Sequence, residues 1–252
     1  LSLMKKYLLG VAAALAFVAP GVASAQSGYV DLGYTNTDVG SVDADTWQLG
    51  GATVFGGDNA LGFQVDGSFG NQDFGGGGDA DLYNTGGHVF TRNDSHMVGG
   101  FVGYGRTDFG PFDYDYWTVG AEGAIYADRN TFSGVLAYSD ASDFDASMTT
   151  LDVGVTHFVT DNFSIGGGVG LGTIDSGSSS DVWQANLGAE YQFAALPISI
   201  YGGYQHSDYD GLDADALTAG VRYNFGGTLL DRDRSGASLS RGNGFARLGG
   251  IL

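Results

Sequence analysis

Carboxylate side chains stand within segments in which every second residue is apolar. The most evident are Asp31, Asp66, Glu122, Asp152 and Glu190. A period of two is typical of β-strands, in which successive side chains point to opposite faces, so these carboxylates gather on one face. Acidic residues on one face attract cations, and rings of Asp or Glu select cations in pores. The alternative role is structural, because polar side chains also pair merely to fill a small interior.

One basic residue, Arg222, holds the same position in its segment as Glu190 holds in an earlier one. If one further strand separates the two, they lie about 10 Å apart, since neighbouring strands are about 4.8 Å apart. Long side chains span that distance, so we expect an ion pair that narrows the interior. The residues predicted to line the interior are Asp31, Gln64, Asp66, Glu122, Asp152, Glu190 and Arg222.

The sequence offers only weak candidates for metal binding. The segment SDYDGLDAD resembles part of a calcium loop, but it lacks an acid at the first position and the closing glutamate, so we favour a solvated acidic loop. GGGGDAD, residues 75–81, resembles one unit of a calcium-binding repeat, and one unit does not form a solenoid. We expect no cofactor, and at most collective binding of divalent cations by acidic loops. The weak calcium candidates are Asp208, Asp210, Asp213 and Asp215.

Histidines are the candidate bases for catalysis. His206 is followed by Ser207 and Asp208. Adjacent residues on a strand face opposite sides, however, so His206 and Ser207 do not form a base and nucleophile pair. The sequence contains no G-x-S-x-G motif and no histidine pair with metal-ligand spacing. We therefore expect that the protein is not an enzyme.

Acidic residues outnumber basic ones 29 to 10 in the 252 residues, which gives a formal net charge of −19. A chain of this charge does not bind nucleic acid electrostatically. The absence of cysteine excludes disulfides and thiolate metal sites. Glycine is unusually frequent, at 45 residues, yet 14 Tyr, 16 Phe and three Trp in regular positions argue against disorder.

The first residues have the parts of a secretory signal peptide. Two lysines precede an apolar run, residues 7–18, and a small-residue cleavage site follows at residues 23–25. The run is shorter than the roughly 20 residues that a membrane-spanning helix needs. We predict that residues 1–25 are an N-terminal extension and cleaved signal peptide.

The elements that must position the carboxylates are strands. Between Gly28 and Phe225 we count about twelve alternating segments, with 10 to 14 compatible, each near the length of about ten residues that a tilted transmembrane strand requires. Short connections alternate with longer Asp-, Gly- and Ser-rich ones, such as residues 206–215. The pattern predicts an all-β, antiparallel, up-and-down transmembrane barrel over residues 26–225. A soluble β-sandwich or a glycine-rich solenoid is the alternative.

The last segment carries the most specific pattern. In ALTAGVRYNF, residues 216–225, a polar residue, a glycine and two aromatics resemble the terminal-strand signal of bacterial outer-membrane β-barrels, and residues 185–193 repeat it. Such barrels place aromatic girdles at the two bilayer interfaces. We predict this girdle from Trp47, Phe55, Phe90, Trp117, Phe158, Trp183, Tyr191, Phe193, Tyr223 and Phe225.

Alternation also assigns the two faces of most strands. Leu49, Val119 and Leu187 are expected to face lipid, and their polar neighbours to face inward. A charge on the lipid face near the midplane costs about 2–4 kcal/mol, so the ionisable residues decide the assignment. The segment from His96 to Arg106 is too glycine-rich to be assigned.

A basic tail, residues 226–252, follows the terminal Phe at which such barrels usually end. It carries Arg232, Arg234, Arg241 and Arg247 against Asp231 and Asp233. In one interpretation the tail enters the periplasmic mouth and lies against carboxylates of the lumen. In the other, which we favour, it is a disordered periplasmic extension.

The region up to Phe225 resembles bacterial outer-membrane porins. The resemblance implies a cofactor-free channel in the bacterial outer membrane for passive diffusion of ions and small hydrophilic solutes, with a preference for cations. The alternative is a non-conducting structural or surface-interaction barrel whose acidic loops bind divalent cations. The expected partners are outer-membrane lipid, lipopolysaccharide and, through the terminal strand, the barrel-assembly machinery. Nucleic acid is not expected, and the chain is a monomer or a homotrimer.

Overall fold

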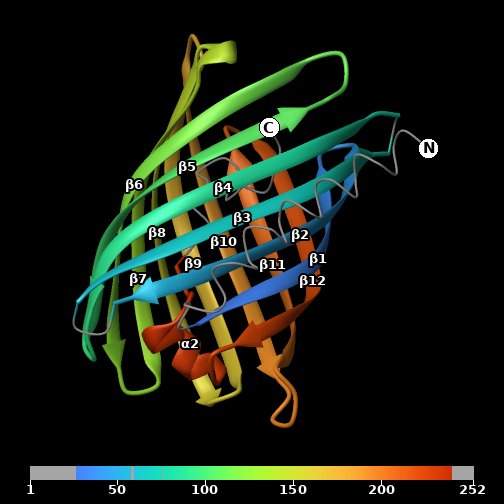
Figure 1. Cartoon of the computed structure of the whole chain (residues 1–252). Coiled ribbons are helices and arrows are strands. Elements are labelled where there is room, and N and C mark those ends of the chain that lie inside the picture. Colours follow the sequence, from blue (N-terminus) through green and yellow to red (C-terminus); the bar gives the residue numbers. More distant parts are fainter. Residues whose placement is uncertain (1–26, 58–59, 76, 240–252) are drawn as a thin grey trace.

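Twelve strands follow one another around a closed barrel (Figure 1). The computed structural model describes residues 27–57, 60–75 and 77–239, so the predicted signal peptide and the distal Arg241 and Arg247 lie outside the described residues. Each strand pairs antiparallel with the next, and β12 pairs with β1. The predicted all-β, up-and-down barrel of about twelve strands is confirmed. The strands are β1 (Ser27–Val39), β2 (Val42–Gly56), β3 (Leu61–Phe74), β4 (Asp79–Arg92), β5 (His96–Asp108), β6 (Asp113–Ala127), β7 (Asn130–Ala141), β8 (Ala146–Thr160), β9 (Phe163–Asp175), β10 (Ser179–Gln192), β11 (Ile198–Tyr209) and β12 (Leu212–Phe225).

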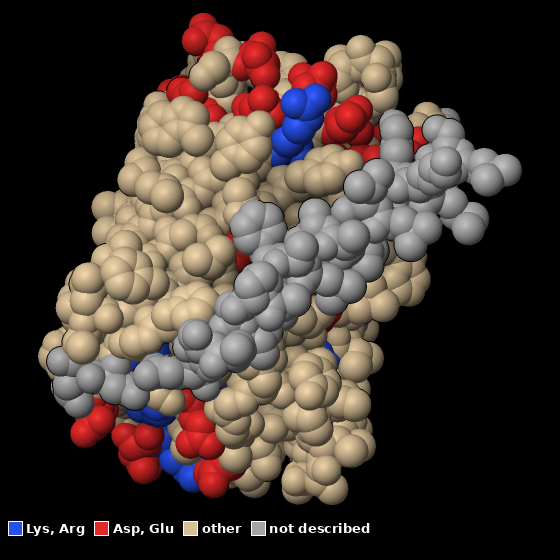
Figure 2. All heavy atoms as spheres, viewed as in Figure 1, with Lys and Arg blue, Asp and Glu red and all other residues tan. Residues whose placement is uncertain are grey.

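Because the sheet is closed, alternate residues of each strand face the lumen and the residues between them face the outside of the barrel. The register pairs Asp31 with Arg222 at the β1–β12 seam, and paired residues share a face. On the outer face Leu187 and Leu217 are 65% and 63% exposed, which suits side chains that face lipid. On the side shown in Figure 2, charged residues gather toward the two ends of the barrel, and the belt between them is mostly uncharged.

The glycine-rich β5, whose faces the sequence left unassigned, follows the same rule. Met97 and Phe101 are buried on the inner face, whereas Val98 and Val102 are exposed on the outer face. Small inward residues elsewhere on this strand leave room for rings from neighbouring strands. A Cβ atom at Gly105, for example, would come within 2.1 Å of the Tyr116 ring.

The connection predicted as a long loop at residues 206–215 is a tight hairpin. β11 ends at Tyr209 and β12 begins at Leu212, so Asp210 and Gly211 alone form the turn. Their φ angles of 56° and 91° are those of a two-residue type I′ turn. The loop prediction was wrong because Asp and Gly, which usually indicate loops, here continue the hydrogen-bonded ladder of a solvated hairpin.

Two residues of the predicted aromatic girdle lie on the inner face. Phe90 and Phe158 are 2% and 3% exposed and have the same parity as the inward-facing His88 and Asp152. The girdle prediction is wrong for both. It rested on their position near a strand end, whereas the alternation of side chains along the strand places both on the inner face. The Phe90 ring also fills space over Gly62, where a Cβ atom would come within 2.6 Å of it. The other predicted girdle residues lie on the outer face: Trp47, Phe55, Trp117, Trp183, Tyr191, Phe193, Tyr223 and Phe225.

Beyond β12 the chain forms a short helix, α2 (Leu229–Ser235). The Thr228 hydroxyl accepts from the Asp231 N–H, and the Asp231 carboxylate accepts from the Thr228 N–H, which is a capping box. Figure 1 shows α2 at the mouth where β1 begins and β12 ends, which we call the terminal mouth. The opposite mouth, with the Asp210–Gly211 turn, is the loop mouth. Within the described ranges, no helix is long and apolar enough to cross a membrane.

Candidate functional site in the barrel lumen

The residues predicted to line the interior all lie on the inner face. The register places Asp31 opposite Arg222, Gln64 opposite His88, and Asp152 opposite Gly170, all inward. Gln64 is 0% exposed, and Asp31, Asp66 and Glu122 are also buried. Residues that line a wide water-filled channel would be exposed, so this part of the lumen is filled by side chains. That these residues line a conducting pore remains a prediction.

A histidine to which the sequence assigned no role bridges two of the predicted carboxylates. His88 Nε2 lies 2.9 Å from Asp66 Oδ2, and His88 Nδ1 lies 2.7 Å from Glu122 Oε1. The three side chains are at most 2% exposed, and Phe101 stacks on the imidazole with ring centroids 5.3 Å apart. Two carboxylates on one imidazole are compensated best when both ring nitrogens donate. The alternation along β4 would have placed His88 on the inner face, on the strand that pairs with the strand of Asp66.

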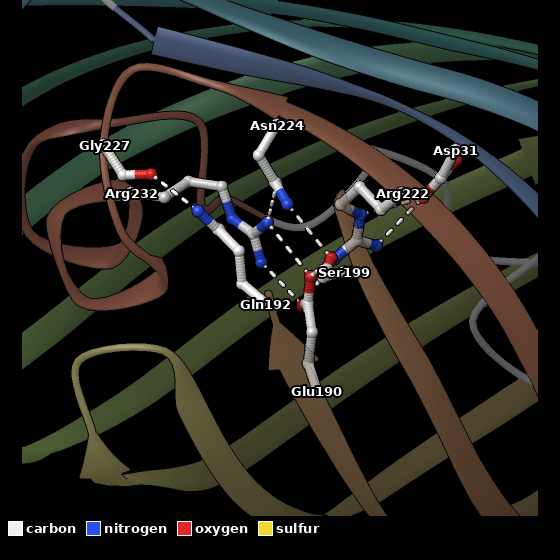
Figure 3. A network of polar contacts seen from close by, with 8 residues as sticks. All are labelled: Asp31, Glu190, Gln192, Ser199, Arg222, Asn224, Gly227 and Arg232. Atoms are coloured by element: carbon white, nitrogen blue, oxygen red, sulfur yellow. Dashed lines mark hydrogen bonds and ion pairs between the residues drawn. The ribbon is translucent and has the colours of Figure 1, made fainter. Parts of the chain in front are cut away.

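A second cluster joins the barrel to its tail (Figure 3). Arg222 Nη2 lies 2.9 Å from Asp31 Oδ2, and Arg222 Nη1 lies 2.6 Å from Glu190 Oε2. The expected ion pair between Glu190 and Arg222 is therefore present. From α2, Arg232 Nη2 approaches the same Glu190 oxygen to 2.7 Å, and Arg232 also donates to Asn224. Ser199 Oγ donates to the other Glu190 oxygen at 2.5 Å.

The tail continues beyond α2 along the inner face of the terminal mouth. The Gln64 amide donates to the Leu239 carbonyl and accepts from the Leu239 N–H, each at 3.2 Å. Arg92 Nη1 donates to the Gly236 carbonyl at 2.8 Å. Leu229 and Leu239 are buried. For residues 229–239 the favoured expectation of a disordered extension is wrong, because these contacts order the segment inside the mouth.

One carboxylate of α2 is held against β7. Thr131 Oγ1 donates to Asp233 Oδ2 at 2.5 Å, and Arg234 Nε lies 3.2 Å from the same oxygen. Burial raises the pKa of Asp233 above its ordinary value, although Thr131 and the nearby arginines act in the opposite direction. The docked tail therefore disfavours the ionised form of this group.

The accessible part of the lumen lies along β8, β9 and β10. Four of the inward positions that line it are glycine, at 154, 166, 168 and 188, so this wall presents bare backbone. A cavity of about 630 Å³ lies against it. The inward-facing Ser133 and Asn186 are exposed, unlike the buried inward residues of β3 to β6. The polar residues that line the cavity include Asp152, Gln184, Asn186, Glu190, Gln205 and Arg222.

Apolar and aromatic side chains narrow the lumen nearer the loop mouth. Met148 and Val182 are 1% and 2% exposed although they face inward, so other side chains cover them. Tyr114 and Tyr116 from β6 belong to the same cluster, and Tyr209 packs against it. The cavity therefore lies between this cluster and the tail.

The acidic hairpin presents its side chains in different directions. Asp215 accepts from the Tyr204 hydroxyl at 2.5 Å, and His206 Nδ1 lies 2.9 Å from it, on the outer face. Ser207 is buried on the inner face, so His206 and Ser207 point to opposite sides. In the part of the chain that the structure describes, no group of three or more His, Cys, Asp or Glu could hold a metal ion. The calcium candidates Asp208, Asp210, Asp213 and Asp215 all lie on or beside this hairpin turn.

Comparison with known families assigns most of the chain. Residues 49–225 match the family model described as outer membrane protein beta-barrel domain. The chain belongs to this family. Its location is therefore the bacterial outer membrane, and the barrel spans that membrane with its strands. Among proteins of curated function, none matches this sequence.

Solved outer-membrane barrels share the fold at low sequence identity. The COG4313 outer membrane channel from Pseudomonas putida F1 is 13% identical with a TM-score of 0.64, covering 80% of this chain and 96% of that chain. The KdgM porin, solved in complex with disordered oligogalacturonate, is 11% identical with a TM-score of 0.56, covering 78% of this chain and 99% of that chain. The translocator domain of the autotransporter NalP from Neisseria meningitidis is 13% identical with a TM-score of 0.56, covering 89% and 98%. Channels and porins are thus among the structures that this barrel resembles.

Proposed function

We propose that this barrel is a passive channel for ions and small hydrophilic solutes, with a preference for cations. The observation that carries the proposal is the polar cavity of about 630 Å³ along β8 to β10. Ser133 and Asn186 face inward there and are exposed, as residues beside a solute path should be. A purely structural barrel gains nothing from an inner wall with glycine at several inward positions, since packing the interior would stabilise it.

The cation preference rests on the charges of the inner face. Asp31, Asp66, Glu122, Asp152 and Glu190 face inward, whereas the inward cations of the strands are Arg92, Arg222 and the bridging His88. An excess of carboxylates in a low-dielectric passage lowers the potential for cations. Arg232 of the tail offsets part of this excess at Glu190. The preference should therefore strengthen when the tail leaves the mouth.

A non-conducting structural barrel is the second candidate. The tail in the terminal mouth and the buried cluster around Met148 near the loop mouth favour it. In either case we expect lipid and lipopolysaccharide around the barrel, insertion by the barrel-assembly machinery, a monomer or homotrimer, and no enzymatic activity.

Planar-bilayer recording distinguishes the two candidates. We expect small discrete current steps from the mature chain, and larger steps with a more cation-selective reversal potential in a KCl gradient after truncation behind Phe225. Circular dichroism would establish that both proteins are folded. Folded proteins that are silent with and without the tail would contradict the channel and support the structural barrel.

A further inference from the structure

Five aromatic rings from separate connections meet at the loop mouth. Phe109 stacks on Phe74, Phe112 and Tyr114, with ring centroids 6.1, 5.0 and 6.3 Å apart. Phe144, the last residue of the 3₁₀ helix η1 (Ser142–Phe144), meets the Tyr114 ring edge-on at 4.9 Å. We call these five rings the aromatic patch. Phe112 and Phe144 are 56% and 54% exposed, so the patch presents apolar surface.

The aromatic patch covers the mouth and does not face lipid. Tyr114 is buried on the inner face of β6, and Phe109 packs against the same inward cluster. On the outer face of β6, Trp117 follows Phe112 by five positions. At about 3.3 Å per residue and a tilt near 40°, Phe112 lies roughly 12 Å beyond Trp117 along the barrel axis. If Trp117 marks the bilayer interface, as aromatic residues at strand ends do, the exposed rings lie outside the membrane.

Carboxylates surround the aromatic patch. In residues 71–81, 106–115 and 140–147, which carry the rings, nine aspartates stand against one basic residue, Arg106. Arg106 is itself held by Asp113, with Nη2 and Oδ2 2.5 Å apart. Figure 2 shows the acidic residues that crowd this end of the barrel on the side in view. The exposed aspartates around the patch are Asp73, Asp79, Asp113, Asp143 and Asp145.

The rings are held in place before any partner arrives. The Asp115 N–H of β6 donates to Asp143 Oδ2 at 3.2 Å, which ties η1 to the strand that carries Tyr114. In the β5–β6 connection, the Phe109 N–H donates to the Phe112 carbonyl at 2.9 Å. A surface that is already ordered loses less conformational entropy on binding.

The charge of the rim decides which occupant fits. A second copy of the same face is repelled, because the same carboxylates would oppose one another. Anionic lipid headgroups are repelled for the same reason. A small inorganic cation would use the carboxylates and leave the rings exposed. A polypeptide with basic and apolar side chains suits both parts, since arginine pairs with carboxylates and also stacks on aromatic rings.

We propose that the aromatic patch and its acidic rim form a docking surface for a basic polypeptide segment that carries aromatic or aliphatic side chains. Exposed apolar surface with a polar rim is typical of such interfaces, and the opposite charges would speed the encounter. The inference goes beyond the proposed channel, because the surface serves whether or not the lumen conducts.

Fluorescence anisotropy tests the docking surface with the full mature chain in phosphatidylcholine nanodiscs and empty discs as the blank. The probe is a labelled peptide in which arginine alternates with phenylalanine. Two matched peptides replace either its phenylalanines by serine or its arginines by glutamate, and both should bind at least about fivefold more weakly. The double variant Phe112→Ser, Phe144→Ser should weaken binding of the probe at least about fivefold. Leu212→Ser is its control, since Leu212 is also exposed at the loop mouth but contributes no ring to the patch, and affinity should not change.

A second pair of variants tests the rim. Asp79→Asn with Asp145→Asn should weaken binding of the probe at least about threefold. Asp94→Asn with Asp128→Asn makes the same change of net charge on exposed residues at the terminal mouth, and should leave the affinity unchanged. Equal losses in the two pairs would show that net charge alone attracts the peptide and would overturn the inference.

Other outcomes would also overturn it. These are no binding of the probe beyond that of empty discs, equal binding of the serine peptide, or unchanged affinity in the phenylalanine variant. Sedimentation of the chain as a dimer that the phenylalanine variant abolishes would make a second copy the occupant. Retention on anionic vesicles that the same variant abolishes would make lipid headgroups the occupant. If the double variant does not fold, Phe112→Ser alone replaces it and should weaken binding at least about twofold.

Discussion

The Glu190 carboxylate forms ion pairs with two arginines from different parts of the chain, so a single residue affects both the charge of the lumen and the position of the tail. Arg222 belongs to β12, whereas Arg232 belongs to the tail helix α2. Arg222 also binds Asp31, so the barrel keeps an ion pair of its own when Arg232 leaves. Tail docking and lumen charge are therefore linked at one carboxylate.

Arg232→Gln should loosen the tail without disturbing the barrel. It removes a charge-assisted hydrogen bond to Glu190, which is worth about 1–3 kcal/mol. We expect a larger single-channel conductance than that of the wild-type chain. Arg106→Gln is the control, because Arg106 pairs with Asp113 on the outer surface. Equal conductance of Arg232→Gln and wild type would show that this contact does not hold the tail.

His88→Leu should destabilise the whole barrel. The substitution leaves Asp66 and Glu122 buried without the imidazole between them, and breaking a buried ion pair costs about 3–5 kcal/mol. Urea unfolding followed by circular dichroism would measure this loss. His157→Leu, at an exposed histidine bonded to Asn130, should cost less than about 1 kcal/mol. Similar losses in the two variants would contradict the bridging role.

At this scale, alternation alone places residues such as Glu122 on the inner face, because a one-residue shift would turn its charge into lipid. It does not reveal partners. His88 and Glu122 stand on β4 and β6, which are not neighbours, and they meet only because the closed sheet curves around the lumen. Strict alternation along β4 and β8 likewise places Phe90 and Phe158 on the inner face, and so excludes them from the girdle.

At the scale of elements, α2 combines interactions that favour its docking in the terminal mouth with one that disfavours it. The capping box at Thr228 and Asp231 starts the helix, and Arg232 and Leu229 hold it in the terminal mouth. Asp233 opposes docking when it is ionised, because burial disfavours its charge. A helix of seven residues is not stable alone, so the T-x-x-D pattern at residues 228–231 does not by itself predict an ordered helix, and composition suggested disorder. Contacts with the lumen, and with the turns at the rim such as the Asp161 carbonyl that accepts from the Leu230 N–H, order the helix.

Asp233→Asn and Asp231→Ala should change tail docking in opposite directions at pH 7. The raised pKa of Asp233 means that its contribution to docking is full below the ordinary carboxyl pKa and is lost as the pH rises through the raised value. In Asp233→Asn the amide carries no charge and can still accept from Thr131, so trypsin should cleave the tail more slowly. Asp231→Ala removes the capping box and should speed cleavage, since such a cap is worth about 1 kcal/mol.

The pH dependence provides the control for this pair. The groups that face Asp233 are Thr131 on β7, Arg92 on β4, Tyr126 on β6, and Arg232 and Arg234 on α2; the arginines stay charged and the tyrosine stays neutral between pH 3 and pH 7. The advantage of Asp233→Asn should therefore vanish near about pH 3, where the Asp233 carboxyl of the wild-type chain is protonated, as measured with an acid protease. An advantage that persists at low pH would contradict the buried-carboxylate explanation.

At the scale of the whole molecule, the barrel has two unlike sides. The inner face of β3 to β6 is filled by buried residues such as His88 and Phe101, whereas glycines leave the inner face of β8 to β10 open. The period of two predicted an up-and-down barrel of about twelve strands, because inside-outside alternation is a local property of each strand. The unequal filling depends on which side chains meet across the lumen, and strand-by-strand patterns do not contain that information.

The central claim is that solutes pass along the glycine-lined wall of β8 to β10. The chain has no cysteine, so single introduced cysteines can be modified selectively. The measurement is the single-channel current of the chain truncated behind Phe225 before and after addition of a water-soluble, positively charged methanethiosulfonate. Ser133→Cys and Asn186→Cys face the cavity and are exposed, whereas Ser139→Cys is an inward control that is 1% exposed. We predict that the reagent reduces the current in the first two variants and leaves the third unchanged. Unchanged current in both cavity variants, although mass spectrometry shows that they are modified, would contradict the account.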